Sequence, residues 1–312
     1  MENGRVSGAV CSDQTGNRSF DIKARCVIDA TIVFSDSIRR MDNPQVQRII
    51  TASQGPHIVV DEEKLPMKSA LIVPKTSEGR VLFSIPWHNR IIIGTTDTPV
   101  NSIDEPPKPF AEEIGFILDN ANQYFSATID LSDIKSAYAG LRPLVNQNPK
   151  GGSTSQISRD HHIEISDTGL ITIAGGKWTT YRKMGEEVIN KAEEFSGLDS
   201  LGCQTESLEI HTLMPTATSE EEKLHADLPF TRDQLQASIK SEMAMTIEDV
   251  LARRLRATVL DNEAATSLAN EVASILVSTG RLSETGKAKA IEEFIANNQI
   301  DLKSLPSMES GS

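Results

Sequence analysis

The chain has 312 residues, of which 24% are charged and 38% hydrophobic, and its formal net charge at pH 7 is −13. This length predicts two domains with substantial cores, and the mean hydropathy of −0.27 is typical of a soluble globular protein. The negative charge argues against general nucleic-acid binding, and no apolar run approaches the ~20 residues of a membrane span. Three cysteines without metal-ligand spacing predict free thiols and no metal site.

The first fifty residues alternate between strand and helix patterns. We expect strands over residues 5–10 and 20–30 around a turn at 13–17, and a helix over 35–50. Within the second strand, residues 26–31 read as a buried strand that enters a nucleotide-binding domain. The chain lacks Gly-x-Gly-x-x-Gly, since none of its 19 glycines has that spacing.

The next hundred residues are rich in strand patterns. Short apolar runs separated by Pro, Gly and Asn predict an antiparallel sheet from strands at residues 57–60, 70–73, 80–85 and 91–95. A proline-rich loop then precedes a helix over 111–125, and residues 134–141 return to strand. Residues 146–155 read as a polar loop.

Residues 170–184 contain the most informative feature of the chain. An apolar run predicts a strand over 170–174, paired with another over 161–165, and Gly175 and Gly176 follow. Lys177, Thr179 and Thr180 come next, and helical spacing begins at Tyr181. A strand, a Gly-Gly turn and a helix start place bare N–H groups and positive charge together, which attracts phosphate, carboxylate or an electron-rich ring. We expect Thr179 and Thr180 to cap the helix.

The last third of the chain turns helical. Residues 196–230 read as a linker, and a small helical bundle is predicted from residue 231, with one helix spanning 247–259. The final residues, 307–312, are expected to be disordered.

Several motifs together resemble the FAD-dependent glycerol-3-phosphate dehydrogenases that pass electrons to quinone. These motifs are residues 55–60 (Gly-Pro-His-Ile-Val-Val), 94–97 (Gly-Thr-Thr-Asp), 138–144 (Tyr-Ala-Gly-Leu-Arg-Pro-Leu), 158–161 (Ser-Arg-Asp-His), 175–182 (Gly-Gly-Lys-Trp-Thr-Thr-Tyr-Arg) and 248–254 (Glu-Asp-Val-Leu-Ala-Arg-Arg). The resemblance covers about residues 4–297. The missing glycine fingerprint suggests a truncated form that begins inside the flavin domain.

The resemblance implies a mixed α/β and α+β fold with five segments. Residues 1–50 would be a partial Rossmann-like FAD-binding domain, and 51–165 an antiparallel substrate-binding sheet domain. Residues 166–195 would be the return strand and helix of the FAD domain, 196–230 a linker, and 231–306 an all-α bundle.

The family reaction transfers a hydride from C2 of sn-glycerol 3-phosphate to FAD and gives dihydroxyacetone phosphate. Arg142, Arg159 and Lys177 are the candidates for the phosphate, and Arg142 and His57 are the catalytic candidates. From the residues alone, Arg142 equally suits a surface ion pair, and a lone histidine is more often structural. We expect Asp97 to bind backbone N–H groups in a turn.

The resemblance also implies which residues contact the cofactor, namely Ala30, Thr31, Gly175, Gly176, Lys177, Thr179 and Thr180. Ile32 occupies the position of a family glycine near the flavin, where a β-branched residue is expected to clash or be strained. Trp87 and Trp178 are predicted to be packing residues.

The implied partners are the substrate and a quinone acceptor, with a cytoplasmic location, peripheral contact with the inner face of the cell membrane, and self-association into a homo-oligomer. Two alternatives remain open. One is another flavin oxidoreductase of the same fold, such as an amine or hydroxy-acid oxidase. The other is a catalytically inactive remnant that acts only in binding.

Overall fold

The computed structural model describes residues 1–14, 16–74, 76, 79–103, 106–145, 160–216 and 222–299. The chain divides into two compact units. Unit 1 comprises Met1–Gln54, Asp97–Pro107 and Leu141–Glu209, and unit 2 comprises Gly55–Thr96, Lys108–Gly140 and Ile210–Ser312. The chain therefore passes between the units several times, and each unit is described by itself.

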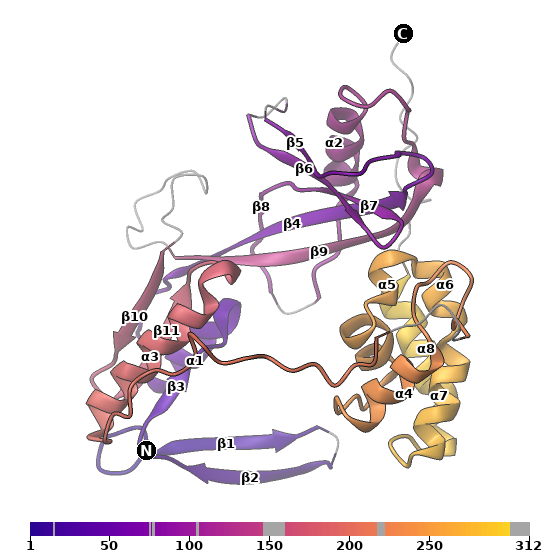
Figure 1. The fold of residues 1–312 in the computed structure, drawn as a ribbon. Coiled ribbons are helices and arrows are strands. Elements are labelled where there is room, and N and C mark those ends of the chain that lie inside the picture. The colour runs from indigo at the N-terminus through magenta and orange to yellow at the C-terminus, as the bar shows by residue number, and fades with distance from the viewer. Residues whose placement is uncertain are drawn as a thin grey trace. The chain divides into compact units, whose positions relative to one another are not determined.

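Unit 1 contains a hairpin and a three-stranded sheet (Figure 1). The hairpin pairs β1 (Gly8–Asp13) with β2 (Arg18–Lys23). In the sheet, β10 (His161–Ile165) runs antiparallel to β11 (Leu170–Gly175), which runs parallel to β3 (Val27–Asp29). Apolar residues of β11 pack against α3 (Tyr181–Ser196), so that the helix covers the strand that precedes it.

The helix predicted over residues 35–50 is shorter in the structure. After the 3₁₀ turn η1 (Ile32–Phe34), α1 spans Ser35–Asp42 and ends before Pro44. Proline has no N–H for a helical hydrogen bond, and it forces the preceding residue out of the helical region. Asn43 accordingly adopts an extended conformation with φ −132° and ψ 103°.

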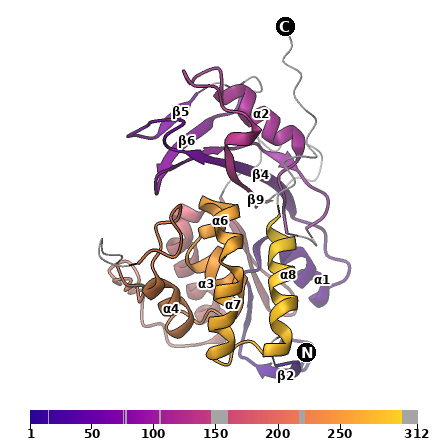
Figure 2. The same ribbon diagram turned by 90° about the vertical axis from the view of Figure 1, so that its right-hand side faces the viewer.

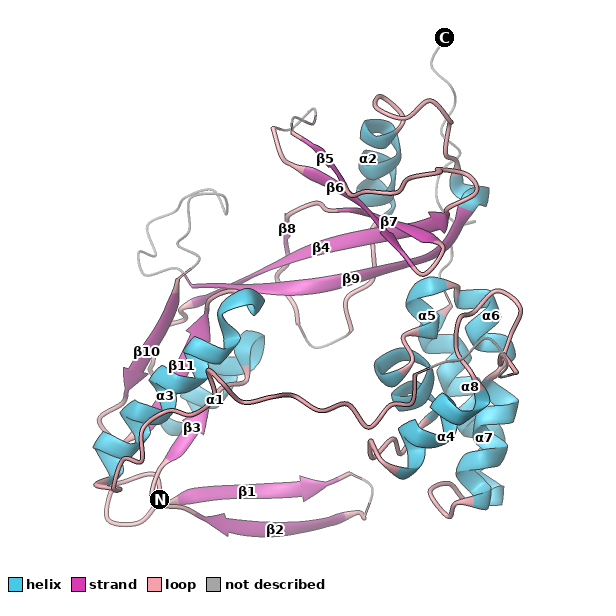
Figure 3. Ribbon diagram, in the orientation of Figure 1, coloured by secondary structure: helices cyan, strands magenta, loops and turns pink. Residues whose placement is uncertain are grey.

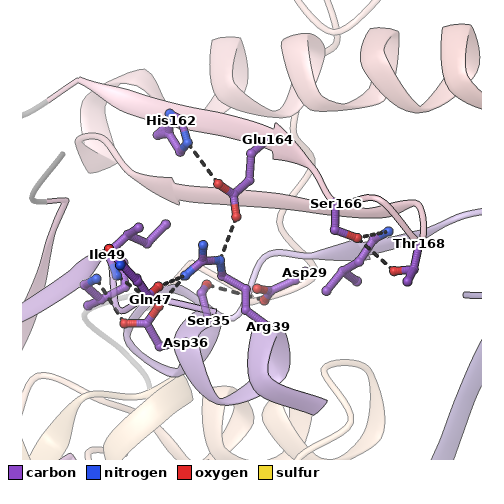
Figure 4. A network of polar contacts seen from close by, with 12 residues as sticks. Asp29, Ser35, Asp36, Arg39, Gln47, Ile49, His162, Glu164, Ser166 and Thr168 are labelled. Carbon is purple, nitrogen blue, oxygen red and sulfur yellow. Dashed lines mark hydrogen bonds and ion pairs between the residues drawn. The ribbon is translucent and has the colours of Figure 1, made fainter. Parts of the chain in front are cut away.

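A buried arginine fixes α1 to the rest of unit 1 (Figure 4). The Arg39 side chain is 6% exposed, and its Nε donates to Glu164 Oε1 on β10 at 2.7 Å. Its Nη1 donates to Asp36 Oδ1 and to the Gln47 carbonyl, each at 2.8 Å. Asp36 in turn accepts from the Ile49 N–H at 3.2 Å. The guanidinium thus ties a helix, a strand and a loop together.

The second sheet has the strand order β5–β6–β7–β4–β8, with β9 paired to β4. Its strands are β4 (Ile50–Asp61), β5 (Leu71–Val73), β6 (Leu82–Trp87), β7 (Arg90–Gly94), β8 (Thr98–Pro99) and β9 (Ile134–Val145). Their antiparallel pairing confirms the sheet that the sequence predicts. In unit 2, α2 (Ala111–Ala121) packs its apolar stripe, including Ile114 and Ile117, on this sheet.

The remaining part of unit 2 is helical (Figures 2 and 3). It contains α4 (Arg232–Lys240), the π-helix η5 (Asp249–Arg254), α5 (Ala257–Leu260), α6 (Asn262–Ser267), α7 (Ala269–Ser278) and α8 (Lys287–Asn298). The single helix expected over 247–259 is interrupted at Arg256, whose φ of 58° is left-handed. The mixed fold and the C-terminal helical region otherwise agree with prediction.

Residues 197–216 form no helix or strand, as Figure 3 shows. Among the described helices, none has the length and apolar character that crossing a membrane requires. The expected disorder at 307–312 concerns residues outside the described ranges.

Arg90 joins the sheet of unit 2 to its helices. Its side chain is 8% exposed and forms ion pairs with Asp61 Oδ1 at 2.7 Å and with Asp261 Oδ2 at 3.2 Å. The guanidinium also donates to the carbonyls of Asp227 at 3.1 Å and Leu260 at 3.3 Å. The Asp261 side chain is 6% exposed, and its Oδ1 also accepts from the Ala264 N–H, so that it caps α6.

Replacing Arg90 with leucine is therefore expected to destabilise unit 2 by about 3–5 kcal/mol, because the Asp261 carboxylate would stay buried without a counter-charge. The measurement is the free energy of unfolding in urea. Arg18→Ala is the control, since it removes an ion pair whose arginine is 77% exposed and should cost less than about 1 kcal/mol. A loss below about 1 kcal/mol for Arg90→Leu would contradict the assigned role.

Candidate functional site

Gly175 ends β11 and Gly176 follows it, at a point where little room is left for side chains. Gly175 and Gly176 have φ values of 74° and 81°, in the region that favours glycine. A Cβ on Gly175 would lie 2.7 Å from Val145 Cγ2, and one on Gly176 would lie 2.5 Å from Met184 Sδ. The positive φ values therefore favour glycine at both positions, and Val145 or Met184 would have to shift to admit a side chain.

The start of α3 differs from the expected capped helix. A 3₁₀ turn, η4 (Trp178–Thr180), precedes the helix, and neither Lys177 nor Thr180 makes a side-chain capping bond. The Thr180 hydroxyl instead donates to the Lys177 carbonyl at 3.0 Å. The prediction that Thr180 caps the helix is therefore wrong, because the hydroxyl closes the preceding turn. No side chain caps the start of α3, and the Thr180 and Tyr181 N–H groups donate to the carbonyls of Lys177 and Trp178.

Residues 177–180 are all exposed. Lys177 forms no ion pair with any residue of the described ranges, so its charge is not neutralised there. Trp178 is 85% exposed and stacks on Tyr181, with ring centroids 5.4 Å apart. The prediction that Trp178 is a packing residue is wrong, whereas Trp87 packs against the helical core of unit 2.

Arg142 lies near the end of β9 and forms an ion pair with Asp97, at 3.6 Å between Nη1 and Oδ1. The Ser53 hydroxyl donates to the same Asp97 oxygen. The Arg142 side chain is 34% exposed. Asp97 thus anchors Arg142 to the first part of β4, while the arginine keeps access to solvent.

Arg159, the second arginine expected at the phosphate, lies outside the described residues. The third candidate cation, Lys177, belongs to unit 1 together with Arg142.

His57 belongs to unit 2 and lies within β4 opposite Gly94 of β7. A Cβ on Gly94 would lie 2.4 Å from His57 Cδ2, so glycine makes room for the imidazole. The ring stacks on Tyr138, with centroids 5.2 Å apart and 13° between the planes. Burial raises the pKa of Tyr138, which keeps this partner a neutral phenol at physiological pH. His57 is half-buried and held in one plane.

The end of β3 carries the remaining cofactor candidates. Asp29 is 2% exposed, and its Oδ1 accepts from the Thr31 N–H at 3.0 Å and the Thr31 hydroxyl at 2.7 Å. Ala30 and Thr31 are exposed. Ile32 has a φ of 58° and is 50% exposed. Its backbone is left-handed, the strained conformation expected where the sequence replaces a glycine.

The predicted residues therefore fall into two groups. Ala30, Thr31, Arg142, Lys177 and the Gly-Gly turn belong to unit 1, whereas His57 belongs to unit 2. The sequence did not predict that Asp97 and Ser53 hold Arg142, since residues so far apart in the chain carry no spacing signal. Within the described ranges, no group of histidine, cysteine and carboxylate side chains could hold a metal ion.

Comparison with known families gives two matches. Residues 1–182 match the model of the FAD dependent oxidoreductase family. Residues 166–287 match the C-terminal domain of alpha-glycerophosphate oxidase.

Two curated relatives are mitochondrial glycerol-3-phosphate dehydrogenases. The Mus musculus protein is 45% identical over 206 residues, which is 65% of this chain and 28% of the relative. A probable enzyme of Dictyostelium discoideum is 31% identical over 349 residues, which is 97% of this chain and 54% of the relative. The chain thus spans about a quarter to a half of the length of these relatives.

A solved structure shares the fold. The glycerol-3-phosphate dehydrogenase from Bacillus halodurans, determined in complex with FAD, matches with a TM-score of 0.76 at 23% identity. The match covers 96% of this chain and 66% of the bacterial chain.

The strain at Ile32 generates a prediction that needs no ligand. Ile32→Gly should raise the free energy of unfolding of unit 1 by about 1 kcal/mol, because glycine adopts a φ of 58° without the steric cost that a β-branched residue carries. The matched control is Val33→Gly, at the neighbouring residue without positive φ, which should lower stability by about 1 kcal/mol. If both variants lose stability equally, the strain assigned to Ile32 is absent.

Proposed function

Since the chain belongs to the family of FAD-dependent oxidoreductases, we propose that it takes part in the oxidation of sn-glycerol 3-phosphate to dihydroxyacetone phosphate. The observation that carries the proposal is the start of α3, where Lys177 and uncapped N–H groups follow the turn at Gly175 and Gly176. A dianionic substrate and an electron-accepting ring both need such positive groups.

The turn fits the flavin ring of FAD. Its residues 177–180 are exposed, and no side chain caps the helix start that follows. We assign Gly175, Gly176, Lys177, Thr179 and Thr180 to the ring. Bound FAD supplies the hydride acceptor, and a helix N-terminus stabilises negative charge on its pyrimidine edge. At the end of β3, we assign Ala30 and Thr31 to the cofactor as well. The half-exposed side chain of Ile32 would narrow the space through which the flavin approaches these two residues.

The substrate phosphate is assigned to Arg142, Arg159 and Lys177. A guanidinium binds phosphate through two parallel N–H donors, and its planar geometry must be oriented. Asp97 supplies that orientation for Arg142, because its carboxylate is itself held by Ser53. Three cations suit a phosphate dianion better than a single carboxylate, which favours this substrate over those of an amine or hydroxy-acid oxidase.

His57 is assigned to the C2 hydroxyl group. A ring nitrogen of neutral imidazole would accept the hydroxyl proton as the hydride leaves C2. Stacking on Tyr138 and the space left by Gly94 hold the ring in one plane, so that its nitrogens point in fixed directions. This preorganisation is what a general base requires.

We divide the chain functionally as the sequence suggests. Residues 1–50 and 166–195 would contribute to the FAD domain, 51–165 to the substrate domain, and 231–306 to a helical domain after the linker at 196–230. The electron acceptor is a quinone, reached at the inner face of the cell membrane by a cytoplasmic protein that associates peripherally. A homo-oligomer is part of the same proposal.

An inactive remnant that only binds is the second candidate, and the strained Ile32 favours it. A glycerol 3-phosphate oxidation assay on the complete gene product with added FAD separates the two. Turnover with an artificial dye supports the enzyme. Binding of FAD or substrate without any turnover supports the remnant.

Arg142→Ala is expected to lower kcat/KM for glycerol 3-phosphate by an amount equal to about 2–4 kcal/mol, as for loss of a charge-assisted contact with the phosphate. Arg182→Ala is the control, because this arginine pairs with Glu186 along α3 at 2.9 Å and has no assigned substrate contact. An unchanged kcat/KM in Arg142→Ala would remove this residue from the site.

His57→Ala is expected to slow substrate-dependent flavin reduction by about 10²–10⁴-fold, the usual contribution of a general base. The acid limb of the pH–rate profile should disappear together with the imidazole. The control is His88→Ala, since His88 lies in the turn between β6 and β7 and has no assigned step. A small loss of rate with an unaltered pH profile would show that His57 only positions the substrate.

A further inference from the structure

His161 connects three elements around the Gly175–Gly176 turn. It begins β10 and lies opposite Gly175 in the register of β10 and β11. Its Nε2 is 2.7 Å from Glu187 Oε2 on α3. The imidazole therefore bridges the strand beside the turn to the helix that follows it.

The backbone of Gly176 is enclosed on both sides. A Cβ at this residue would lie 2.5 Å from Met184 Sδ on α3 and 3.1 Å from His161 Cβ on β10. Met184 and Glu187 are three residues apart on α3, so they share one face of the helix. That face supplies both the side chain that contacts the turn and the carboxylate that holds His161.

The neighbouring His162 makes a comparison possible. Adjacent residues of a strand point to opposite faces, and His162 lies 3.4 Å from Glu164, which belongs to the Arg39 network. The His161 side chain is 22% exposed and that of His162 is 31% exposed. The two histidines thus have similar exposure and similar partners, but only His161 adjoins the turn.

From this arrangement we propose that His161, through its contact with Glu187, is the positioning residue for the turn that holds the flavin ring. That the turn binds the flavin ring rests on the proposed function, whereas the contact between His161 and Glu187 does not depend on it. The contact keeps β10 and α3 at a fixed separation, and the N–H groups of residues 176–180 therefore keep one arrangement. A preformed turn binds its ligand without the cost of ordering the backbone.

Other charged groups face the pair. Lys183 Nζ lies 3.9 Å from Glu187 Oε1 and 2.7 Å from Glu186 Oε1, both along α3. Asp160 precedes His161 in the chain. The test therefore uses substitutions rather than pH alone, because a pH change would titrate several of these groups together.

The first measurement is hydrogen exchange, without FAD, of the Thr180 and Tyr181 amides, which donate to the carbonyls of Lys177 and Trp178. In His161→Ala these amides should exchange about tenfold faster than in the parent chain, as for loss of one charge-assisted hydrogen bond. In His162→Ala they should exchange within about twofold of the parent rate. Equal acceleration in both variants overturns the proposal. His161→Gln keeps a side-chain donor and should therefore restore part of the protection from exchange. This variant replaces His161→Ala in the test if His161→Ala fails to fold.

The second measurement is FAD binding to the complete gene product. Binding is monitored through the quenching of Trp178 fluorescence in a Trp87→Phe background. Within residues 1–312, Trp178 is then the only tryptophan, and it adjoins the turn. The dissociation constant should rise about tenfold in His161→Ala and in Glu187→Ala, and no further in the double variant. Independent, additive effects of the two substitutions overturn the proposal.

A merely structural role predicts a different pattern. His161→Ala and His162→Ala would then lower the thermal midpoint and the FAD affinity together. If the parent protein takes up no FAD, the cofactor assignment of the proposed function fails, and the exchange rates of the Thr180 and Tyr181 amides still decide whether His161 positions the turn.

Discussion

The end of β11 has no space for side chains, because Val145, Met184 and His161 lie where the Cβ atoms of residues 175 and 176 would be. Segments far apart in the sequence meet there, from β9, β10 and α3. A Cβ at residue 175 or 176 would lie 2.5–3.1 Å from the nearest atoms of these three segments. The next four residues, 177–180, are all exposed, so this closely packed part of unit 1 adjoins an exposed segment.

Burial separates the arginines of this protein by role. Arg39 and Arg90 are almost fully buried, and within the described residues they bind carboxylates and carbonyls of the chain. Such residues fix elements in place. Arg142 is one-third exposed and has a carboxylate partner that is itself anchored, so its guanidinium is oriented without being enclosed. This difference supports assigning a ligand to Arg142 rather than to the other two.

The sequence predicts the helices and strands better than the contacts between them. Short apolar runs separated by Pro, Gly and Asn identify the strands between His57 and Gly94. The helix predicted over residues 35–50 overlooked Pro44, before which α1 ends. The ion pair between Arg142 and Asp97 has no local signature, since it depends on how β9 follows β4. The sequence equally gives no sign that Trp178 is exposed, because a large aromatic residue beside a helix is usually buried.

Arg90 also has a consequence for how the chain responds to a protease. Residues 197–216 form no regular element, and exposed segments of this kind are preferred cleavage sites. A cut there would break the covalent connection between the helices and the sheet of unit 2, but not the contacts between them. Arg90 on β7 still binds Asp261 and the carbonyls of Asp227 and Leu260 across the cut. The two fragments would therefore co-purify as a nicked complex and separate only under denaturing conditions.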